Sequence, residues 1–224
     1  MKAANRARAG YLGASTTTSG FRVVERQKIE KYPGAYWKSY DFGSDELAKD
    51  DYLQRNPLQH ALGPDFKGNP YSDKAFRHDG GEVIFNLPNG MQAYLVVDGE
   101  GRRMDAPPIW ILKDKNEFAG TPQIVNGISC MACHSQGMQT VSDQVARQTE
   151  KGEMRRGGDT LRSRWLLGKL YVPKQEMDDL LKADQKRFLD AVNAATKPFL
   201  TDANGRVENP KIELIYGVTQ RYRQ

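Results

Sequence analysis

The sequence predicts an α+β fold, in which a small antiparallel β meander precedes a short cysteine-containing motif and a mainly helical C-terminal part. Two observations carry this prediction. Residues 82–87 and 91–97 alternate apolar and polar side chains around a Pro-Asn-Gly turn at residues 88–90, which is typical of a β-hairpin. Beyond Pro173, apolar residues recur at a spacing that suits one face of an amphipathic helix.

The segments before the hairpin are less regular. Residues 1–20 are rich in Ala, Gly, Ser and Thr, which predicts a flexible arm. Residues 21–29 alternate loosely and suit either a short strand or an extended arm. Residues 32–42 are dense in aromatic side chains, including Trp37, and serve either as a core anchor or as the wall of a cofactor pocket. Residues 45–74 are polar and interrupted by Pro and Gly, which predicts mostly loop after a short initial helix.

The segments after the hairpin complete the expected fold. A turn at residues 98–101 leads to a third predicted strand at 108–112. Helices are expected at residues 143–150 and 160–170. The amphipathic helix that begins at Pro173 is expected to break near Asp184 and to end at Pro198.

These segments predict three regions along the chain. Residues 1–20 form the arm, residues 21–200 form a single domain, and residues 201–224 form either a C-terminal tail or a continuation that has been cut short. A chain of 224 residues can bury a core that needs no disulfide framework. It has no apolar run of the roughly 18 residues that a membrane-spanning helix needs, and no apolar stretch of a signal peptide follows the basic N-terminus.

The charge balance suggests the kind of partner. Lys and Arg number 33 against 28 Asp and Glu, a net charge of +5. This basic excess is mild and spread along the chain, so it favours an acidic protein partner and argues against nucleic acid.

The most specific feature is the string Cys130-Met131-Ala132-Cys133-His134. Cys-x-x-Cys-His is the pattern of c-type haem attachment. Two thiols one helical turn apart can each add to one vinyl group on the same haem edge, and the next residue brings its imidazole to the iron. We therefore expect one covalent haem c, held by Cys130 and Cys133, with His134 as an iron ligand.

Three other interpretations of the two cysteines are weaker. A thioredoxin-like redox pair needs a βαβ context, whereas the preceding segment here is loop-like. A zinc site usually needs four ligands, and the two other histidines, His60 and His78, are far apart in the sequence. A disulfide within so tight a loop is an unusual sole bridge.

Since bacterial c-type haem is attached outside the cytoplasmic membrane, we expect a periplasmic or otherwise extracytoplasmic location.

The sixth iron position separates electron transfer from catalysis or ligand binding. His78 is the first candidate for a second metal ligand, because two glycines follow Asp79 and allow a bulky group to approach the backbone. Asp79 or Glu82 would then orient its second ring nitrogen. Met104 and His60 are alternatives, and an open site is another.

Further residues are candidates for contact with the cofactor. Met138 lies four residues after His134 and is expected on the same side of the haem as that ligand. Tyr94, Arg77 or His78 would supply a polar group at an open sixth position. The haem propionates would pair with an arginine, for which the sequence offers Arg77, Arg102 and Arg103.

The chain resembles a family of bacterial secreted mono-haem c-type cytochrome domain proteins. The similar segments are residues 76–94 and 126–134, together with 22–26 and 34–42. The resemblance runs from about residue 21 to the helices after residue 137. It implies a single covalent haem, an extracytoplasmic location and a redox role, and it draws attention to His78 in the His-Asp-Gly-Gly-Glu string. The sequence departs from this family in lacking an export signal and in stopping soon after Tyr222.

The function expected from the sequence is extracytoplasmic electron transfer to or from a redox partner protein, rather than enzymatic catalysis. The alternative is a haem enzyme, or a cytochrome that binds peroxide or a nitrogen oxide at an open or exchangeable sixth site. A chain of this length exceeds what a minimal carrier needs, which favours the alternative. A third hypothesis is an interaction module in which the haem mainly completes the core.

Overall fold

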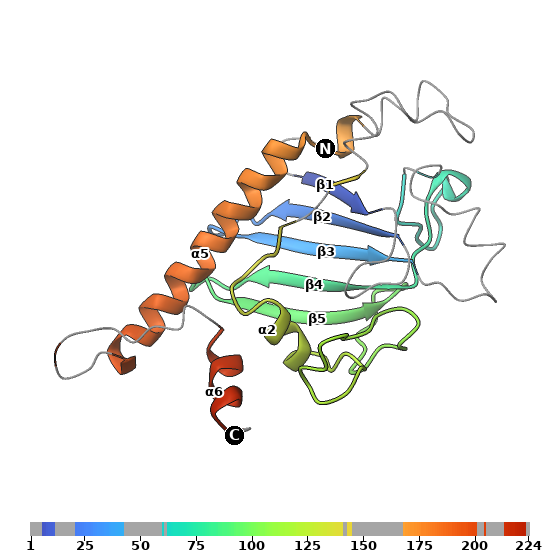
Figure 1. The fold of residues 1–224 in the computed structure, drawn as a ribbon. Coiled ribbons are helices and arrows are strands. Elements are labelled where there is room, and N and C mark those ends of the chain that lie inside the picture. The colour runs from blue at the N-terminus through green and yellow to red at the C-terminus, as the bar shows by residue number, and fades with distance from the viewer. Residues whose placement is uncertain are drawn as a thin grey trace.

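The computed structural model describes residues 6–11, 21–42, 60, 62–140, 143–144, 168–200, 204 and 213–222. These residues form an α+β fold built on one five-stranded antiparallel sheet in which each strand pairs with its neighbour along the chain (Figure 1). The strands are β1 (Arg6–Tyr11), β2 (Arg22–Lys28), β3 (Ala35–Asp41), β4 (Gly80–Asn86) and β5 (Gln92–Asp98). The helices are the 3₁₀ helix η3 (Ser72–Lys74) and the α-helices α2 (Ile128–Cys133), α5 (Lys174–Leu200) and α6 (Leu214–Tyr222).

The predicted hairpin is confirmed as β4 and β5, which pair from Gly80 opposite Asp98 to Asn86 opposite Gln92. The turn closes because the Leu87 N–H donates to the Met91 carbonyl at 2.8 Å. Gly90 has φ +87°, a left-handed conformation that glycine adopts without a steric penalty.

The prediction of a flexible arm at residues 1–20 is wrong for residues 6–11, which form β1 and pair with β2 along their whole length. Ala7 and Ala9 are buried against Met177 and Leu181 of α5. On the other side of the strand, buried Arg8 forms an ion pair with buried Glu25. Small inward side chains let the helix approach closely, and they also give β1 too little hydrophobic contrast to be recognised from sequence.

The third predicted strand, at residues 108–112, is also wrong. The N–H groups of Ile111 and Leu112 both donate to the Pro108 carbonyl, at 3.0 and 3.2 Å, so the segment closes a turn. Pro107 and Pro108 have no N–H to offer to a sheet. The neighbour of β4 on its other side is β3, whose aromatic residues therefore lie in the middle of the sheet.

The amphipathic helix exists as α5, but it is continuous where a break was expected at Asp184, and it runs two residues beyond Pro198. Asp184 points at the sheet, where its carboxylate accepts hydrogen bonds from Arg26 at 2.8 and 3.0 Å and from Trp37 Nε1 at 2.9 Å. A buried carboxylate with this many donors does not interrupt a helix.

Residues 214–222, which fall in the expected C-terminal tail, form α6. This helix is tied to the segment after α2, because the Glu213 N–H donates to the Ser135 carbonyl at 2.5 Å, and the Tyr216 ring packs edge-on against Phe118. Residues 145–150, 160–167, 201–203 and 205–212, to which the predicted helices and tail also extended, lie outside the described residues. None of the helices in the described part of the chain is long and apolar enough to cross a membrane.

The two faces of the sheet have different surroundings. Alternate side chains point to opposite faces of a strand, and Val24, Trp37 and Ile84 pack on the side that α5 covers. We call this the α5 face; α2 lies in front of the same side of the sheet (Figure 1). Tyr40, three residues after Trp37, points to the other side, which we call the opposite face.

Candidate functional site

The helix α2 holds the two cysteines one turn apart. It begins after Gly127, which has φ +86°, and the Ser129 hydroxyl accepts a hydrogen bond from the Val125 N–H at 3.1 Å. The His134 N–H donates to the Cys130 carbonyl at 2.9 Å, so the imidazole follows the helix without a break. Residues three and four apart share one side of a helix, and both thiols are free.

The surroundings of the thiols are apolar. Cys130 is buried with Val96, Ile111, Leu112 and Ile124, and Cys133 is half-buried. Burial is the main reason that the pKa of each thiol is raised to about 12, and the nearby Glu82 carboxylate adds to the effect. A reactive redox pair has a lowered thiol pKa, so this environment does not suit a thioredoxin-like function. Among the described residues, no group of three or more His, Cys, Asp and Glu is arranged to hold a metal ion.

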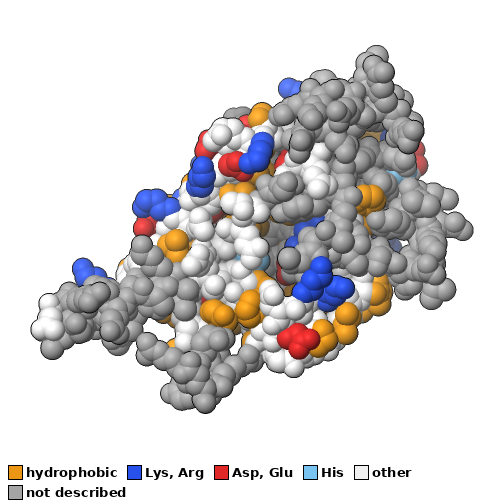
Figure 2. All heavy atoms as spheres, in the orientation of Figure 1, with side chains coloured by type: hydrophobic (Ala, Val, Ile, Leu, Met, Phe, Trp, Pro, Cys, Tyr) orange, Lys and Arg blue, Asp and Glu red, His pale blue; other side chains and the backbone are white. Residues whose placement is uncertain are grey.

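A cavity of about 740 Å³ lies beside Cys133 and His134, on the α5 face of the sheet. Its walls include apolar and aromatic side chains as well as charged ones. Figure 2 shows apolar, basic and acidic side chains close together on one side of the molecule. The apolar group is Val24, Trp37, Ile84, Phe118, Met138 and Tyr216, and the charged group is Arg22, Glu82, Asp114 and Lys115.

The His134 ring is placed as a metal ligand would be. Its Nδ1 lies 3.2 Å from the Gly137 carbonyl oxygen; a proton on Nδ1 makes it the donor and leaves Nε2 with a free lone pair. Metal-ligating histidines usually have their other ring nitrogen held in this way. Burial lowers the pKa of His134, which favours the neutral imidazole, the form that binds metals. The Tyr94 ring stacks nearby, with centroids 6.3 Å apart.

The pocket wall contains an ion pair that the sequence analysis did not assign to the site. Arg22 Nη2 lies 3.0 Å from Glu82 Oε2. Glu82 was expected to orient His78, but it points to the α5 face and lines the cavity. Arg22, Val24 and Arg26 face the same side of β2, and this alternation of basic residues with an apolar one is a signal of inward-facing ion pairs.

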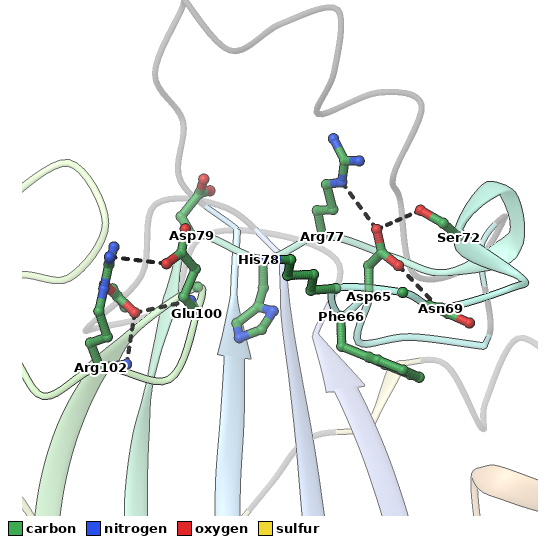
Figure 3. Close-up of a pocket in the computed structure, with 13 residues that line it drawn as sticks. Asp65, Phe66, Asn69, Ser72, Arg77, His78, Asp79, Glu100 and Arg102 are labelled. Atoms are coloured by element: carbon green, nitrogen blue, oxygen red, sulfur yellow. Dashed lines mark hydrogen bonds and ion pairs between the residues drawn. The ribbon is translucent and has the colours of Figure 1, made fainter.

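His78, the expected second ligand, lies on the other side of the sheet. Its ring packs edge-on against Tyr40, with centroids 4.9 Å apart, and near Phe76 at 6.4 Å, so it belongs to the opposite face. His78 lines a separate cavity of about 1000 Å³. Figure 3 shows it between the group of Asp65 and Arg77 and that of Glu100 and Arg102.

The environment of His78 is that of a neutral buried side chain. Burial is the main reason that its pKa is lowered to about 4, and its Nε2 has no hydrogen-bond partner among the described residues. The expectation that His78 and His134 face one iron is therefore wrong for this arrangement, because the sheet stands between them.

The remaining candidates for the sixth iron position also lie in different places. Met138 lines the cavity with His134. Met104 packs against the apolar cluster that contains Cys130. His60 lies away from the cavity, with Nδ1 3.0 Å from the Asp73 carbonyl oxygen.

The three arginines expected to pair with haem propionates lie outside the cavity. Arg77 pairs with Asp65, Arg102 with Asp98 and Arg103 with Asp105. Among the described residues, Arg22 and Lys115 are cations in the cavity wall. Lys38 also borders the cavity, but its Nζ lies 5.0 Å from the centroid of the Tyr40 ring on the opposite face.

Comparison with models of protein families, with curated proteins and with solved structures finds no match to this chain. The resemblance to mono-haem cytochrome domains therefore stays a prediction.

Proposed function

We propose that this protein is a c-type cytochrome with one covalently bound haem c, attached through Cys130 and Cys133 and ligated by His134. The observation that carries the proposal is the position of the Cys-x-x-Cys-His string on α2, with Cys133 and His134 lining a cavity of about 740 Å³. The hydrogen-bonding position of His134 Nδ1 beside the Gly137 carbonyl supports the ligand role.

The residues around the cavity have distinct roles in this proposal. Trp37 and Phe118 offer flat apolar surfaces to a porphyrin, and Tyr94 supports the His134 ring. Lys115 is a cation in the cavity wall that suits a carboxylate side group. When bound, the haem supplies one-electron iron chemistry.

The first physiological role is electron transfer in the periplasm or another extracytoplasmic location. A net charge of +5 favours docking to an acidic redox partner protein. An electron carrier whose haem iron keeps six ligands needs a second protein ligand in the cavity. Among the described residues that line the cavity, Met138 is the methionine. Met138 follows His134 by four residues, so the chain between them is short for reaching both sides of one haem.

The second role, binding or conversion of a small polar ligand such as peroxide or a nitrogen oxide, agrees better with the cavity. His78 lies on the opposite face, and the cavity wall carries the Arg22–Glu82 pair. Such a pair can donate a hydrogen bond to a small ligand and accept a proton from it.

Haem attachment is tested by expressing the chain with an export signal in a host that matures c-type cytochromes. A haem-stained denaturing gel should show one band, and the signal should vanish when Cys130→Ser and Cys133→Ser are combined. A stain that persists in the double variant would disprove covalent attachment.

Carbon monoxide distinguishes the two roles. If the sixth site is open, the reduced protein should be high-spin and should bind carbon monoxide rapidly. A low-spin spectrum that carbon monoxide does not change would reject ligand binding and leave electron transfer.

A further inference from the structure

A fully buried carboxylate, Asp41, lies behind the wall of the cavity at the end of β3. Its side chain is 0% exposed. The Arg22 guanidinium holds both carboxylate oxygens, with Nε donating to Oδ1 and Nη2 to Oδ2 at 3.0 Å. The Ser39 hydroxyl donates to Oδ2 at 2.9 Å. Asp41 thus has a fixed position and no contact with bulk water.

The same two partners connect Asp41 to the cavity. Arg22 Nη2 also lies 3.0 Å from Glu82 Oε2, and the Ser39 hydroxyl accepts a hydrogen bond from the Glu82 N–H at 2.8 Å. Arg22, Ser39 and Glu82 line the cavity, whereas Asp41 stands one residue behind it.

The charges of this network do not balance. Among the described residues, Arg22 from β2 and Glu82 from β4 are the charged groups that act on Asp41, and Ser39 adds a neutral hydroxyl. When both carboxyl groups are ionised, two negative charges share one guanidinium in a poorly hydrated place. Burial, helped by Glu82 and opposed by Arg22 and Ser39, raises the pKa of Asp41 to about 6. The structure thus places a carboxyl group with a raised pKa directly behind the cavity wall.

We propose that Asp41 takes up the proton that accompanies reduction of the haem. One electron from a reduced redox partner converts ferric to ferrous iron, and one proton from solvent converts the Asp41 carboxylate to the carboxylic acid. The charge of the buried region is then the same before and after the step. The physical reason is that an added electron in a region of low dielectric constant raises the proton affinity of a nearby carboxylate, while Arg22 and Glu82 carry the electrostatic coupling.

This inference rests on the proposed haem attachment, so the haem-stained gel is read first. If the gel shows no covalent haem, the proposed function is rejected. If covalent haem is present, the following measurements test the role of Asp41 alone. The midpoint potential of the full holoprotein is titrated spectroelectrochemically from about pH 4 to about pH 8. The sign follows from proton uptake on reduction: the potential should fall as the pH rises through the region around pH 6. One proton per electron gives a tenfold change in the reduction equilibrium per pH unit, about 59 mV.

Three variants test whether the pH dependence of the midpoint potential comes from Asp41. Asp41→Asn should remove most of this pH dependence. Ser39→Ala should keep the slope and move it to higher pH, because it removes a hydrogen bond that favours the ionised form. Asp65→Asn, a matched change in the other cavity, should leave the profile as in the wild type. A flat wild-type profile, or an Asp41→Asn profile with the wild-type slope, would overturn the proposal.

A measurement on the wild type covers the case in which Asp41→Asn does not fold. In the infrared difference spectrum between the oxidised and reduced holoprotein, a protonated carboxyl band should appear on reduction. That band should shift when aspartate is labelled with ¹³C. A band that shifts with labelled glutamate instead, or no band, would reject Asp41 as the acceptor.

Discussion

At the scale of single residues, the sheet buries charges only where partners are present. Asp184 accepts from Arg26 and Trp37, and Glu25 pairs with Arg8. Removing one partner of such a pair leaves an uncompensated charge, which is strongly destabilising. Inward-facing charges therefore mark the positions where these strands allow the least substitution.

His78 and His134 should differ sharply when each is replaced by alanine in the holoprotein. His78→Ala should leave the Soret and visible bands unchanged, because His78 packs against Tyr40 on the opposite face. His134→Ala should change or abolish these bands, since it removes the proposed ligand. Absorbance spectroscopy of both oxidation states makes the comparison. A changed axial ligation in His78→Ala would show that the histidine reaches the iron.

At the scale of helices and strands, sequence patterns correctly predicted the elements that contacts between nearby residues stabilise. The hairpin β4–β5 and the helix α5 follow from alternation and from helical spacing. β1 was missed because its inward residues are alanines, whose role depends on how closely α5 approaches. The false strand at 108–112 has the right apolar residues, but two prolines direct it into a turn.

The pairing of β3 with β4 depends on Gly81. A Cβ at this position would lie 2.0 Å from the Ser39 carbonyl oxygen, so Gly81→Ala should force the two strands apart. Overpacking of this kind typically costs about 1–3 kcal/mol, and we expect a loss of that size in the free energy of unfolding, measured by urea titration. Gly168→Ala is the control, because a Cβ there meets nothing within 4 Å. Equal stability of the two variants would contradict the close strand contact.

At the scale of the whole molecule, the net charge of +5 predicts long-range attraction of acidic partners. Oxidation of the reduced holoprotein by ferricyanide, an anion, should slow as salt is added. Oxidation by a cationic cobalt complex should accelerate, because screening removes a repulsion. The Debye length falls from about 30 Å at 0.01 M to about 8 Å at 0.15 M salt, so stopped-flow measurements across this range are sufficient. Faster oxidation by ferricyanide and slower oxidation by the cobalt complex as salt is added, or no salt effect on either, would reject a basic approach surface.

The sequence by itself determined the features that depend on neighbouring residues. These are the hairpin, the amphipathic helix, and the spacing of Cys130, Cys133 and His134 at the end of one short helix. Each depends on a period or a turn that a few consecutive residues set, so no knowledge of distant contacts was needed. The haem proposal belongs with them, because its main support is the five-residue string itself.

Only the tertiary structure decided which side chains share a cavity. Alternation along β4 places Gly80 and Glu82 on the α5 face, and extending it backwards would place His78 there as well. The strand begins only at Gly80, however, and His78, which precedes it, packs on the opposite face against Tyr40 and Phe76. The physical reason is that strand alternation holds only while sheet hydrogen bonds continue, and beyond them distant packing sets the direction of a side chain. The same long-range packing brings Arg22, Asp41 and Glu82 from three strands into one buried network.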